Sequence, residues 1–250
     1  MRLFAGSAAL LVLAIGSALD AGAVADRVSR VVPIAAGTPI RIDATIADLT
    51  ITGSTRPDVR IDVERRVPAR ADLAKLPVTI DERPDGVRIA VVQEQDARNA
   101  DARAVIAIAV PSDALLQSVR VFEGSVKLAN LRGGCDVDLR RGVIDGDRLA
   151  GRVRLESGLG GIDVRDSELT PGGQMRLRVF NGPLRVRLAR PPSNGRILAV
   201  TLNGAIASDI PLTMKDRFGP RFGESTIGSG DPVLSADVVK GDISLTLAKP

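Results

Sequence analysis

The sequence predicts an all-β protein built as a right-handed β-solenoid, a β-helix-like stack of short strands. The first observation behind this prediction is a phrase in which a glycine is followed by apolar residues at alternate positions. Alternation with a period of two is typical of a strand with one buried face. The copies of the phrase are Gly124–Leu128, Gly151–Leu155, Gly160–Val164, Gly182–Leu188, Gly204–Ile206 and Gly241–Leu247.

The second observation is the spacing of these copies. The glycines at 160, 182 and 204 lie twenty-two residues apart, and those at 151 and 160 lie nine apart. A unit of strands and turns that recurs about every 20 residues suits a solenoid, because each coil covers the core of its neighbour. Glycine before a strand supplies a backbone conformation that other residues resist. We also expect Asn181 and Asn203, which precede two of the glycines, to stack in successive turns.

The third observation is a series of short alternating runs before the repeats. Val59–Glu64 reads as a half-buried strand, and residues 78–80 and 87–91 flank a turn at 83–86 that predicts a hairpin. Residues 69–76 predict one or two helical turns, and 105–110, which are apolar at both parities, predict a strand covered on both faces. We expect a single domain, in which residues 26–118 form an N-terminal β-meander that caps repeats at 119–250.

Residues 1–25 read as a Sec-type signal peptide. Arg2 gives a positive start, an apolar run extends from Leu3 to Leu19, and Ala23-Val-Ala25 fits a small-x-small cleavage site. We expect cleavage after Ala25 and a periplasmic or secreted protein. The alternative is a membrane anchor, but the apolar run is short for a bilayer span. No later segment is long and apolar enough to cross, so we expect no membrane span after cleavage.

The composition argues against several classes of function. The chain of 250 residues has 34 basic and 30 acidic residues, and this excess of +4 is spread along it, so we expect no nucleic-acid partner. There is no histidine, which is the commonest general base and metal ligand, and no tryptophan or tyrosine to form a binding platform. We therefore expect neither a cofactor nor a metal. Cys135 is the one cysteine, and we expect it to be a small residue of the core.

Three features together resemble the DUF4097 family of adhesin-like bacterial exported proteins. They are the strand end at Val110-Pro-Ser112, the repeated glycine phrase, and the segment from Gly228 through Gly241 to Leu245, all behind a signal peptide. The resemblance covers most of residues 31–248. It implies a β-helix-like fold at the cell envelope, with adhesin as a label by analogy, and it supplies no catalytic residues.

A set of arginines forms the first candidate site. These residues alternate with apolar ones in the repeats, so strands stacked in register would gather their guanidinium groups into a surface able to bind phosphate or carboxylate polymers. The alternative is that aspartates from the same repeats neutralise them in a mixed solvated face. The six arginines are Arg152, Arg154, Arg176, Arg178, Arg185 and Arg187.

A second candidate site is the glycine-rich segment at 213–231, which interrupts the repeat spacing. It carries Phe218 and Phe222, which as exposed residues would offer an apolar contact to a partner protein or lipid. The alternative is that this segment folds back to cover one end of the solenoid, because open coil ends must be capped.

Two further patterns are weaker. Asp145-Gly-Asp147 and the run at 158–163 are similar to calcium-binding nonapeptide repeats, but their spacing does not recur as such sites require. Asp136 and Asp138 share strand parity, as a carboxylate pair in a β-helix carbohydrate-active enzyme would. The sequence favours a non-enzymatic, monomeric envelope or surface module that binds an envelope protein or an anionic polysaccharide, and the enzyme remains the alternative.

Overall fold

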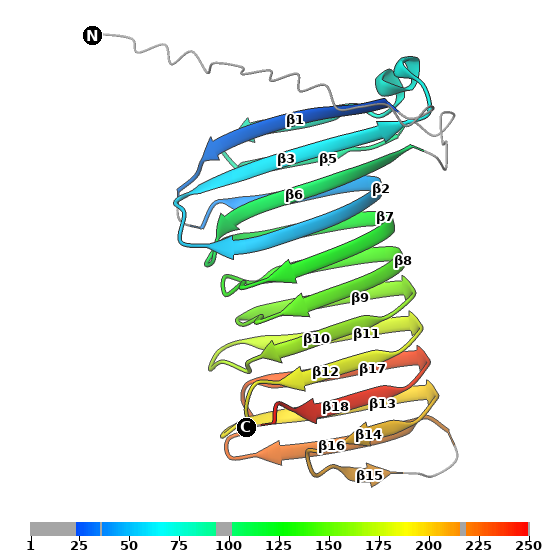
Figure 1. Cartoon of the computed structure of the whole chain (residues 1–250). Helices are drawn as coiled ribbons and strands as arrows, with labels where there is room; N and C mark the ends of the chain where they lie inside the picture. Colours follow the sequence, from blue (N-terminus) through cyan, green and yellow to red (C-terminus); the bar gives the residue numbers. More distant parts are fainter. Residues whose placement is uncertain (1–23, 36, 94–101, 216–218, 250) are drawn as a thin grey trace, which may run out of the picture.

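The computed structural model describes residues 24–35, 37–93, 102–215 and 219–249, and within them the protein is all-β. Its strands belong to one large mixed sheet that winds around a common core (Figure 1). The sheet does not close on itself. The first strands are β1 (Val24–Pro33), β2 (Pro39–Ser54), β3 (Asp58–Val67), β4 (Val78–Arg83), β5 (Gly86–Val91), β6 (Arg103–Pro111), β7 (Leu115–Ala129) and β8 (Cys135–Asp147).

The remaining strands form the narrower part of the stack. They are β9 (Arg152–Leu159), β10 (Ile162–Ser167), β11 (Gln174–Asn181), β12 (Leu184–Leu188), β13 (Gly195–Asn203), β14 (Ile206–Ser208), β15 (Thr213–Lys215), β16 (Arg221–Ile227), β17 (Val233–Lys240) and β18 (Ile243–Leu247).

Each coil of this stack has two faces joined at a glycine corner. The first face contains the first halves of β2, β7 and β8, followed by β9, β11, β17 and β13, and the second face contains their second halves, followed by β10, β12, β18 and β14. At the corner, a Cβ on Gly182 would fall against the carbonyl oxygen of Gly160, and one on Gly160 against that of Gly142. The repeat glycines therefore permit a close approach of successive coils that a side chain would prevent.

The two halves of the repeated phrase lie on different faces. Gly151 precedes β9 on the first face, whereas Gly160 is the corner that leads into β10 on the second face. The nine-residue spacing between them is therefore the length of one side of a coil. The alternation prediction is confirmed on both sides, because Val153, Leu155 and Ile162 are buried.

The order of the coils differs from the order of the chain. β17 pairs in parallel with β11 on one side and with β13 on the other, and β18 lies in the same way between β12 and β14. The last coil of the chain is thus inserted between two earlier ones (Figure 1). Asn181 and Asn203 both face Lys240 in the register, so the expected asparagine stack is wrong.

The N-terminal strands do not form a meander in chain order. β2 pairs in parallel with β5, β6 and β7, while β3 lies antiparallel between β1 and β6. The hairpin prediction is confirmed, because β4 and β5 are antiparallel and Arg83 faces Gly86. The prediction that residues 105–110 form a strand covered on both faces is wrong, because Ile106 and Ile108 of β6 are buried whereas Ala107 between them is exposed.

A short 3-10 helix, η1 (Arg70–Lys75), confirms the helical turn expected at 69–76. Leu76, directly after it, is fully buried. Arg65 anchors this segment by donating hydrogen bonds to the carbonyl oxygens of Leu73 and Leu76, at 3.1 and 2.9 Å. It also binds Asp26 of β1, with 3.0 Å between Nε and Oδ2.

The segment at 213–231 is not an irregular loop. β15 and β16 form an antiparallel pair, and β16 is itself antiparallel to β13. This hairpin therefore extends the first face beyond β13, at the end of the stack. Residues 216–218 lie outside the described residues.

The expected signal peptide falls mostly outside the described residues, since residues 1–23 are not described. Val24 and Ala25 belong to β1, where they face Val67 and Arg66. Cleavage after Ala25 would therefore leave the strand from Asp26 to Pro33.

Candidate functional site

The structure divides the six predicted arginines between the two faces. Arg152 and Arg154 lie on β9, and Arg176 and Arg178 on β11, where the register places Arg154 directly opposite Arg176. Arg185 and Arg187 lie on β12, which belongs to the second face. A single surface with all six arginines is therefore wrong. The cause is the corner at Gly182, because residues after a corner glycine lie on the other side of the coil from residues before it.

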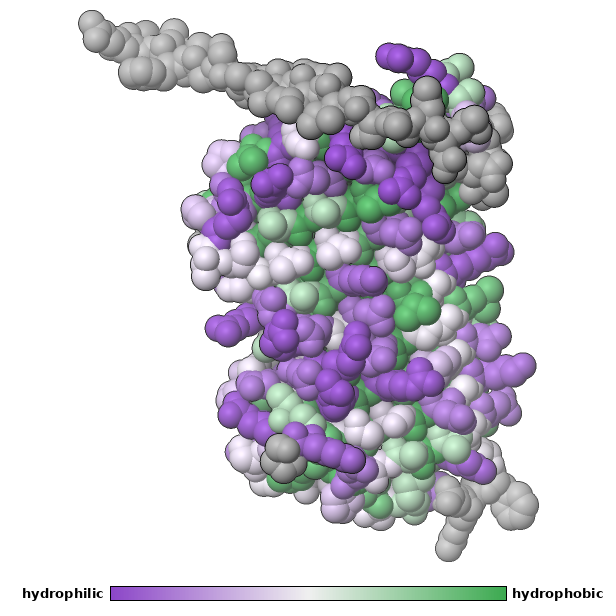
Figure 2. All heavy atoms as spheres, in the orientation of Figure 1, coloured by the Kyte–Doolittle hydropathy of each residue, from purple (hydrophilic) through white to green (hydrophobic). Residues whose placement is uncertain are grey.

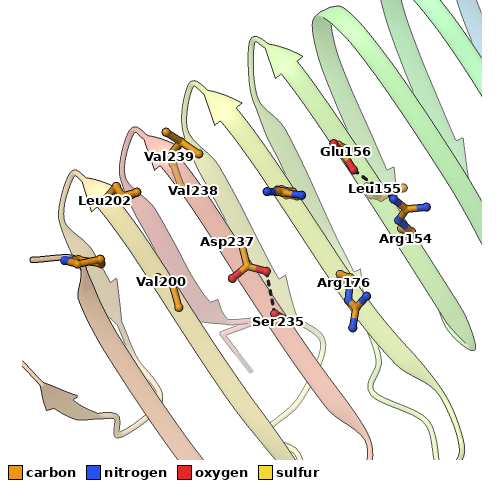
Figure 3. Close-up of a pocket in the computed structure, with 12 residues that line it drawn as sticks. Arg154, Leu155, Glu156, Arg176, Val200, Leu202, Ser235, Asp237, Val238 and Val239 are labelled. Carbon is orange, nitrogen blue, oxygen red and sulfur yellow. Dashed lines mark hydrogen bonds and ion pairs between the residues drawn. The ribbon is translucent and has the colours of Figure 1, made fainter.

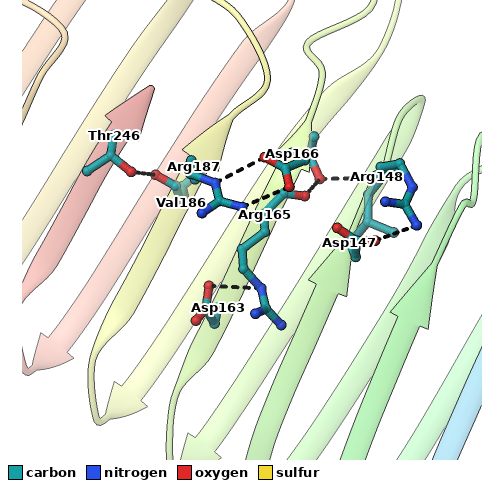
Figure 4. Close-up of polar contacts among 10 residues, drawn as sticks. Asp147, Arg148, Asp163, Arg165, Asp166, Val186, Arg187 and Thr246 are labelled. Atoms are coloured by element: carbon teal, nitrogen blue, oxygen red, sulfur yellow. Dashed lines mark hydrogen bonds and ion pairs between the residues drawn. The ribbon is translucent and has the colours of Figure 1, made fainter. Parts of the chain in front are cut away.

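On the second face, charges of opposite sign neutralise each other (Figure 4). Arg187 donates two hydrogen bonds to Asp166, at 3.0 and 2.8 Å, and this contact lowers the pKa of Asp166. Asp147 pairs with Arg148 at 2.8 Å, and the register places Arg185 opposite Asp163. This arrangement matches the mixed solvated face that is the alternative for these arginines. Figure 2 shows this side of the molecule, where polar side chains cover much of the surface of the repeat coils.

The aspartates considered for calcium belong to the same mixed face. Asp163 lies 3.9 Å from Arg165, and Asp145 faces Lys127 in the register. Among the described residues there is no group of three or more acidic, cysteine or histidine side chains that could hold a metal ion.

The first face carries four of the six predicted arginines, and three of them line a hollow of about 420 Å³. The hollow is lined by Arg154, Arg176, Arg178 and Glu156 on one side, and by Ser235, Asp237 and apolar residues of β13 and β17 on the other. Figure 3 shows Arg154 and Arg176 on neighbouring strands, with Val200, Leu202 and Val239 further along the stack. The side chains that form the hollow point outward from the sheet, because their neighbours in sequence fill the core.

The arginines of this hollow differ in their partners. Arg154 lies 3.2 Å from Asp136 and 3.3 Å from Glu156, and the charge of Asp136 is the main cause of its raised pKa. Among the residues that the structure describes, Arg176 and Arg178 form no ion pair or hydrogen bond through their side chains. Asp237, opposite Arg178, instead accepts a hydrogen bond from Ser235 at 2.9 Å. Of the three arginines that line this hollow, Arg176 and Arg178 are therefore the two without an ion pair among the described residues; Arg176 lies opposite Arg154 and Ser235, and Arg178 lies opposite Glu156 and Asp237.

The carboxylate pair considered for catalysis lies on β8, on the same face. Asp136 and Asp138 line a hollow of about 300 Å³ with Glu156, Arg120 and Arg154. Asp136 and Glu156 both contact Arg154, so this hollow has interleaved charges rather than an isolated pair of carboxylates. Cys135, the first residue of β8, is buried as predicted, and desolvation raises the pKa of its thiol to about 12.

Of the two phenylalanines predicted as a partner contact, the structure describes only Phe222. Phe218 lies outside the described residues. Phe222 lies on β16 and is half-buried, and its ring is 5.3 Å from the ammonium group of Lys215 on β15. This contact holds the hairpin together at the end of the stack.

Sequence analysis missed an outward row of residues next to the corner. Each lies two positions before a corner glycine, and the register places them side by side on six neighbouring strands. The row consists of Phe122, Arg140, Gly158, Phe180, Val239 and Leu202. Phe180 is 61% exposed and Leu202 is 51% exposed. The signal that could have found the row is this fixed offset from the glycines.

Two comparisons found no relative for this chain. No protein-family model matches it, and no curated protein matches it. Within the described residues, no helix is long and apolar enough to span a membrane.

Solved structures of similar fold do exist. The chain is similar to a "putative cell adhesion protein" from Clostridium sporogenes, at 12% identity and a TM-score of 0.51, covering 89% of this chain and 100% of that one. It is also similar to a "putative adhesin" from Bacteroides fragilis, at 13% identity and a TM-score of 0.37, covering 89% of this chain and 97% of that one. At these identities the likeness concerns the fold alone.

Proposed function

We propose that this protein is a non-enzymatic module of the cell envelope or cell surface that binds an anionic polymer on its first face. The binding residues are Arg152, Arg154, Arg176 and Arg178, with Arg176 and Arg178 as the principal contacts. A guanidinium group suits sulfate, phosphate or carboxylate groups because its planar donors can bind two oxygens at once. The partner class is an anionic polysaccharide or an acidic segment of another envelope protein.

The observation that carries the proposal is the contrast between Arg187 on the second face and two arginines, Arg176 and Arg178, on the first face. Arg187 is held by Asp166 through two hydrogen bonds, whereas Arg176 and Arg178 have no ionic partner among the described residues. Like charges on neighbouring strands repel, and Arg154 directly faces Arg176. An anion bound across β9 and β11 would relieve this repulsion.

The setting of this function is part of the same proposal. A signal peptide at residues 1–25, with cleavage after Ala25, would deliver the protein to the periplasm or outside the cell. Membership of the DUF4097 family is supported by the repeated glycine phrase and by the similar fold of the "putative cell adhesion protein" from Clostridium sporogenes. In Figure 1 the front strands run to the left and the back strands to the right as the chain descends, which supports a right-handed coil.

The test is binding to heparin as a model polyanion. We expect R176S/R178S to bind heparin more weakly than wild type by roughly tenfold for each arginine, since each charge-assisted hydrogen bond contributes about 1.5–3 kcal/mol. The measurement is the dissociation constant at low ionic strength, with circular dichroism to check the fold.

The second face provides a matched control. R185S/R187S removes the same number of arginines from β12, where Arg187 is already neutralised by Asp166. We expect this variant to bind heparin within about twofold of wild type, because Arg187 is paired with Asp166 and Arg185 lies opposite Asp163 in the register. Equal losses in the two double variants would show a general charge effect and contradict the proposed site.

The alternative enzyme would use Asp136 and Asp138 against a polysaccharide. The hollow that they line with Glu156 is the observation in its favour. Release of reducing sugar ends from an anionic polysaccharide by wild type, and its loss in D136N/D138N, would support the enzyme and contradict the module.

A further inference from the structure

The apolar part of the row beside the corner is unusual for its position. Phe180 lies near the end of β11, between β9 and β17, in the middle of the stack rather than at an edge. It is nonetheless 61% exposed, and Leu202 of β13 is 51% exposed. Large apolar side chains that gather on the outside of a sheet mark a surface that contacts something else.

The row is straight because it follows the register of the stack. It crosses six neighbouring strands from Phe122 to Leu202, a length of roughly 24 Å at the usual spacing between strands. Gly158 interrupts it with no side chain. This gap forms part of a second hollow, of about 500 Å³, between Phe122 and Phe180.

Basic residues surround this second hollow. Arg140 and Arg178 line it, and Arg141 lines it with its guanidinium group 5.7 Å from the ring of Phe122. Glu123 approaches Arg141 only to 3.9 Å, and Arg140 forms no ion pair within the described part of the chain. Glu156 is the one acidic residue in the described lining of this hollow, so the surface combines exposed apolar side chains with an excess of positive charge.

We propose that this row docks the protein on an anionic lipid bilayer. Phe180 and Leu202 would enter the boundary between headgroups and acyl chains, while Arg140 and Arg141 would bind lipid phosphate groups. A flat bilayer matches a straight row, and its anionic headgroups match the charge. A second copy of this chain does not fit, because two basic surfaces repel each other. The four residues proposed to contact lipid are not the arginines proposed to bind the polymer, although Leu202 and Arg178 bring the two surfaces side by side.

The test is co-sedimentation of the purified chain with vesicles. One set contains phosphatidylglycerol and phosphatidylcholine, and the other contains phosphatidylcholine alone. Every variant keeps the same N-terminus, so residues 1–25 contribute equally to all of them. We expect wild type to bind the anionic vesicles more tightly, and F180S/L202S to bind them roughly ten- to hundredfold more weakly.

Two further variants separate the electrostatic contribution to vesicle binding from the apolar one and provide a control. R140S/R141S should reduce binding to the anionic vesicles several-fold and leave binding to phosphatidylcholine unchanged. V31S is the control, because Val31 is 53% exposed on β1 at the far end of the stack, and it should bind as wild type does. Thermal unfolding of each variant shows whether the fold is kept.

Several outcomes would overturn the inference. These are an absence of preference for anionic vesicles, unchanged binding by F180S/L202S, or an equal loss in V31S. Capture of an acidic protein that depends on Phe180, without any vesicle binding, would also overturn it and assign the row to a protein partner. Heparin binding should be the same in the single variant F180S and wild type, because Phe180 does not line the hollow beside Arg176 and Arg178, so failure of this inference and failure of polymer binding are distinguishable.

Discussion

Gly182 occupies the corner between β11 and β12, and its φ of 146° is a conformation that residues with a side chain rarely adopt. A Cβ there would also fall against the carbonyl oxygen of Gly160 in the adjacent coil. We expect G182A to lower the free energy of unfolding by at least about 3 kcal/mol, because backbone strain and a backbone clash combine. Urea unfolding followed by circular dichroism measures this change.

Gly172 provides the matched control for that substitution. Its φ is also positive, at 71°, but a Cβ would meet nothing within 4 Å. G172A should therefore cost only about 1 kcal/mol, the strain of the left-handed conformation alone. Similar losses in G182A and G172A would mean that close approach of the coils at Gly182 is not the constraint.

Glu64 of β3 makes stability depend on pH. A hydrogen bond from Arg66, followed by one from Arg27, lowers the pKa of its carboxyl below the ordinary value of 4.5. Because the folded-state pKa is the lower one, the stabilisation is fully present above the unfolded-state value and is lost as pH falls through the folded-state value. We expect E64Q to cost up to about 1 kcal/mol at pH 7, the range of exposed ion pairs.

The check on Glu64 is the pH at which this difference disappears. Urea unfolding of wild type and E64Q should give a difference in stability at neutral pH that shrinks to zero once pH is well below 4.5. A difference that persists unchanged in acid would assign the effect to packing instead of to the ion pairs with Arg27 and Arg66.

At the scale of elements, alternation predicts which side chains enter the core but not which strands become neighbours. Val153 and Leu155 are buried and the arginines beside them are exposed, as the period of two requires. The phrases at Gly204 and Gly241 have the same apolar pattern, so either could follow the coil at Gly182. The hairpin β15–β16 extends the first face beyond β13, and the chain then returns to place β17 against β11. That order depends on contacts far apart in sequence.

At the scale of the whole molecule, the sequence predicts which arginines lie together only when their strands belong to the same face of the stack. Arg154 and Arg176 do face each other, because β9 and β11 are the same side of two coils that are consecutive in both the sequence and the stack. Arg185 and Arg187 were added to the same surface because their phrase is similar, but a corner glycine stands between β11 and β12. Phe180 was missed because its exposure follows from the register of six strands, and no single phrase contains that information.

The inserted coil also determines how stability is distributed through the molecule. β17 has strand partners on both sides, whereas within the described part of the chain β14 pairs only with β18, and β15, whose residues are all exposed, pairs only with β16. We expect amide hydrogen exchange to be slow in β17 and β18 and much faster in β14 and β15, although the slow strands lie nearer the end of the chain. Buried strands with two partners open only with larger unfolding events. Hydrogen exchange measured by mass spectrometry on peptides from residues 206–215 and 233–247 tests this order. Exchange in β17 as fast as in β15 would mean that the last coil is not held between two others, and that the stack follows the chain.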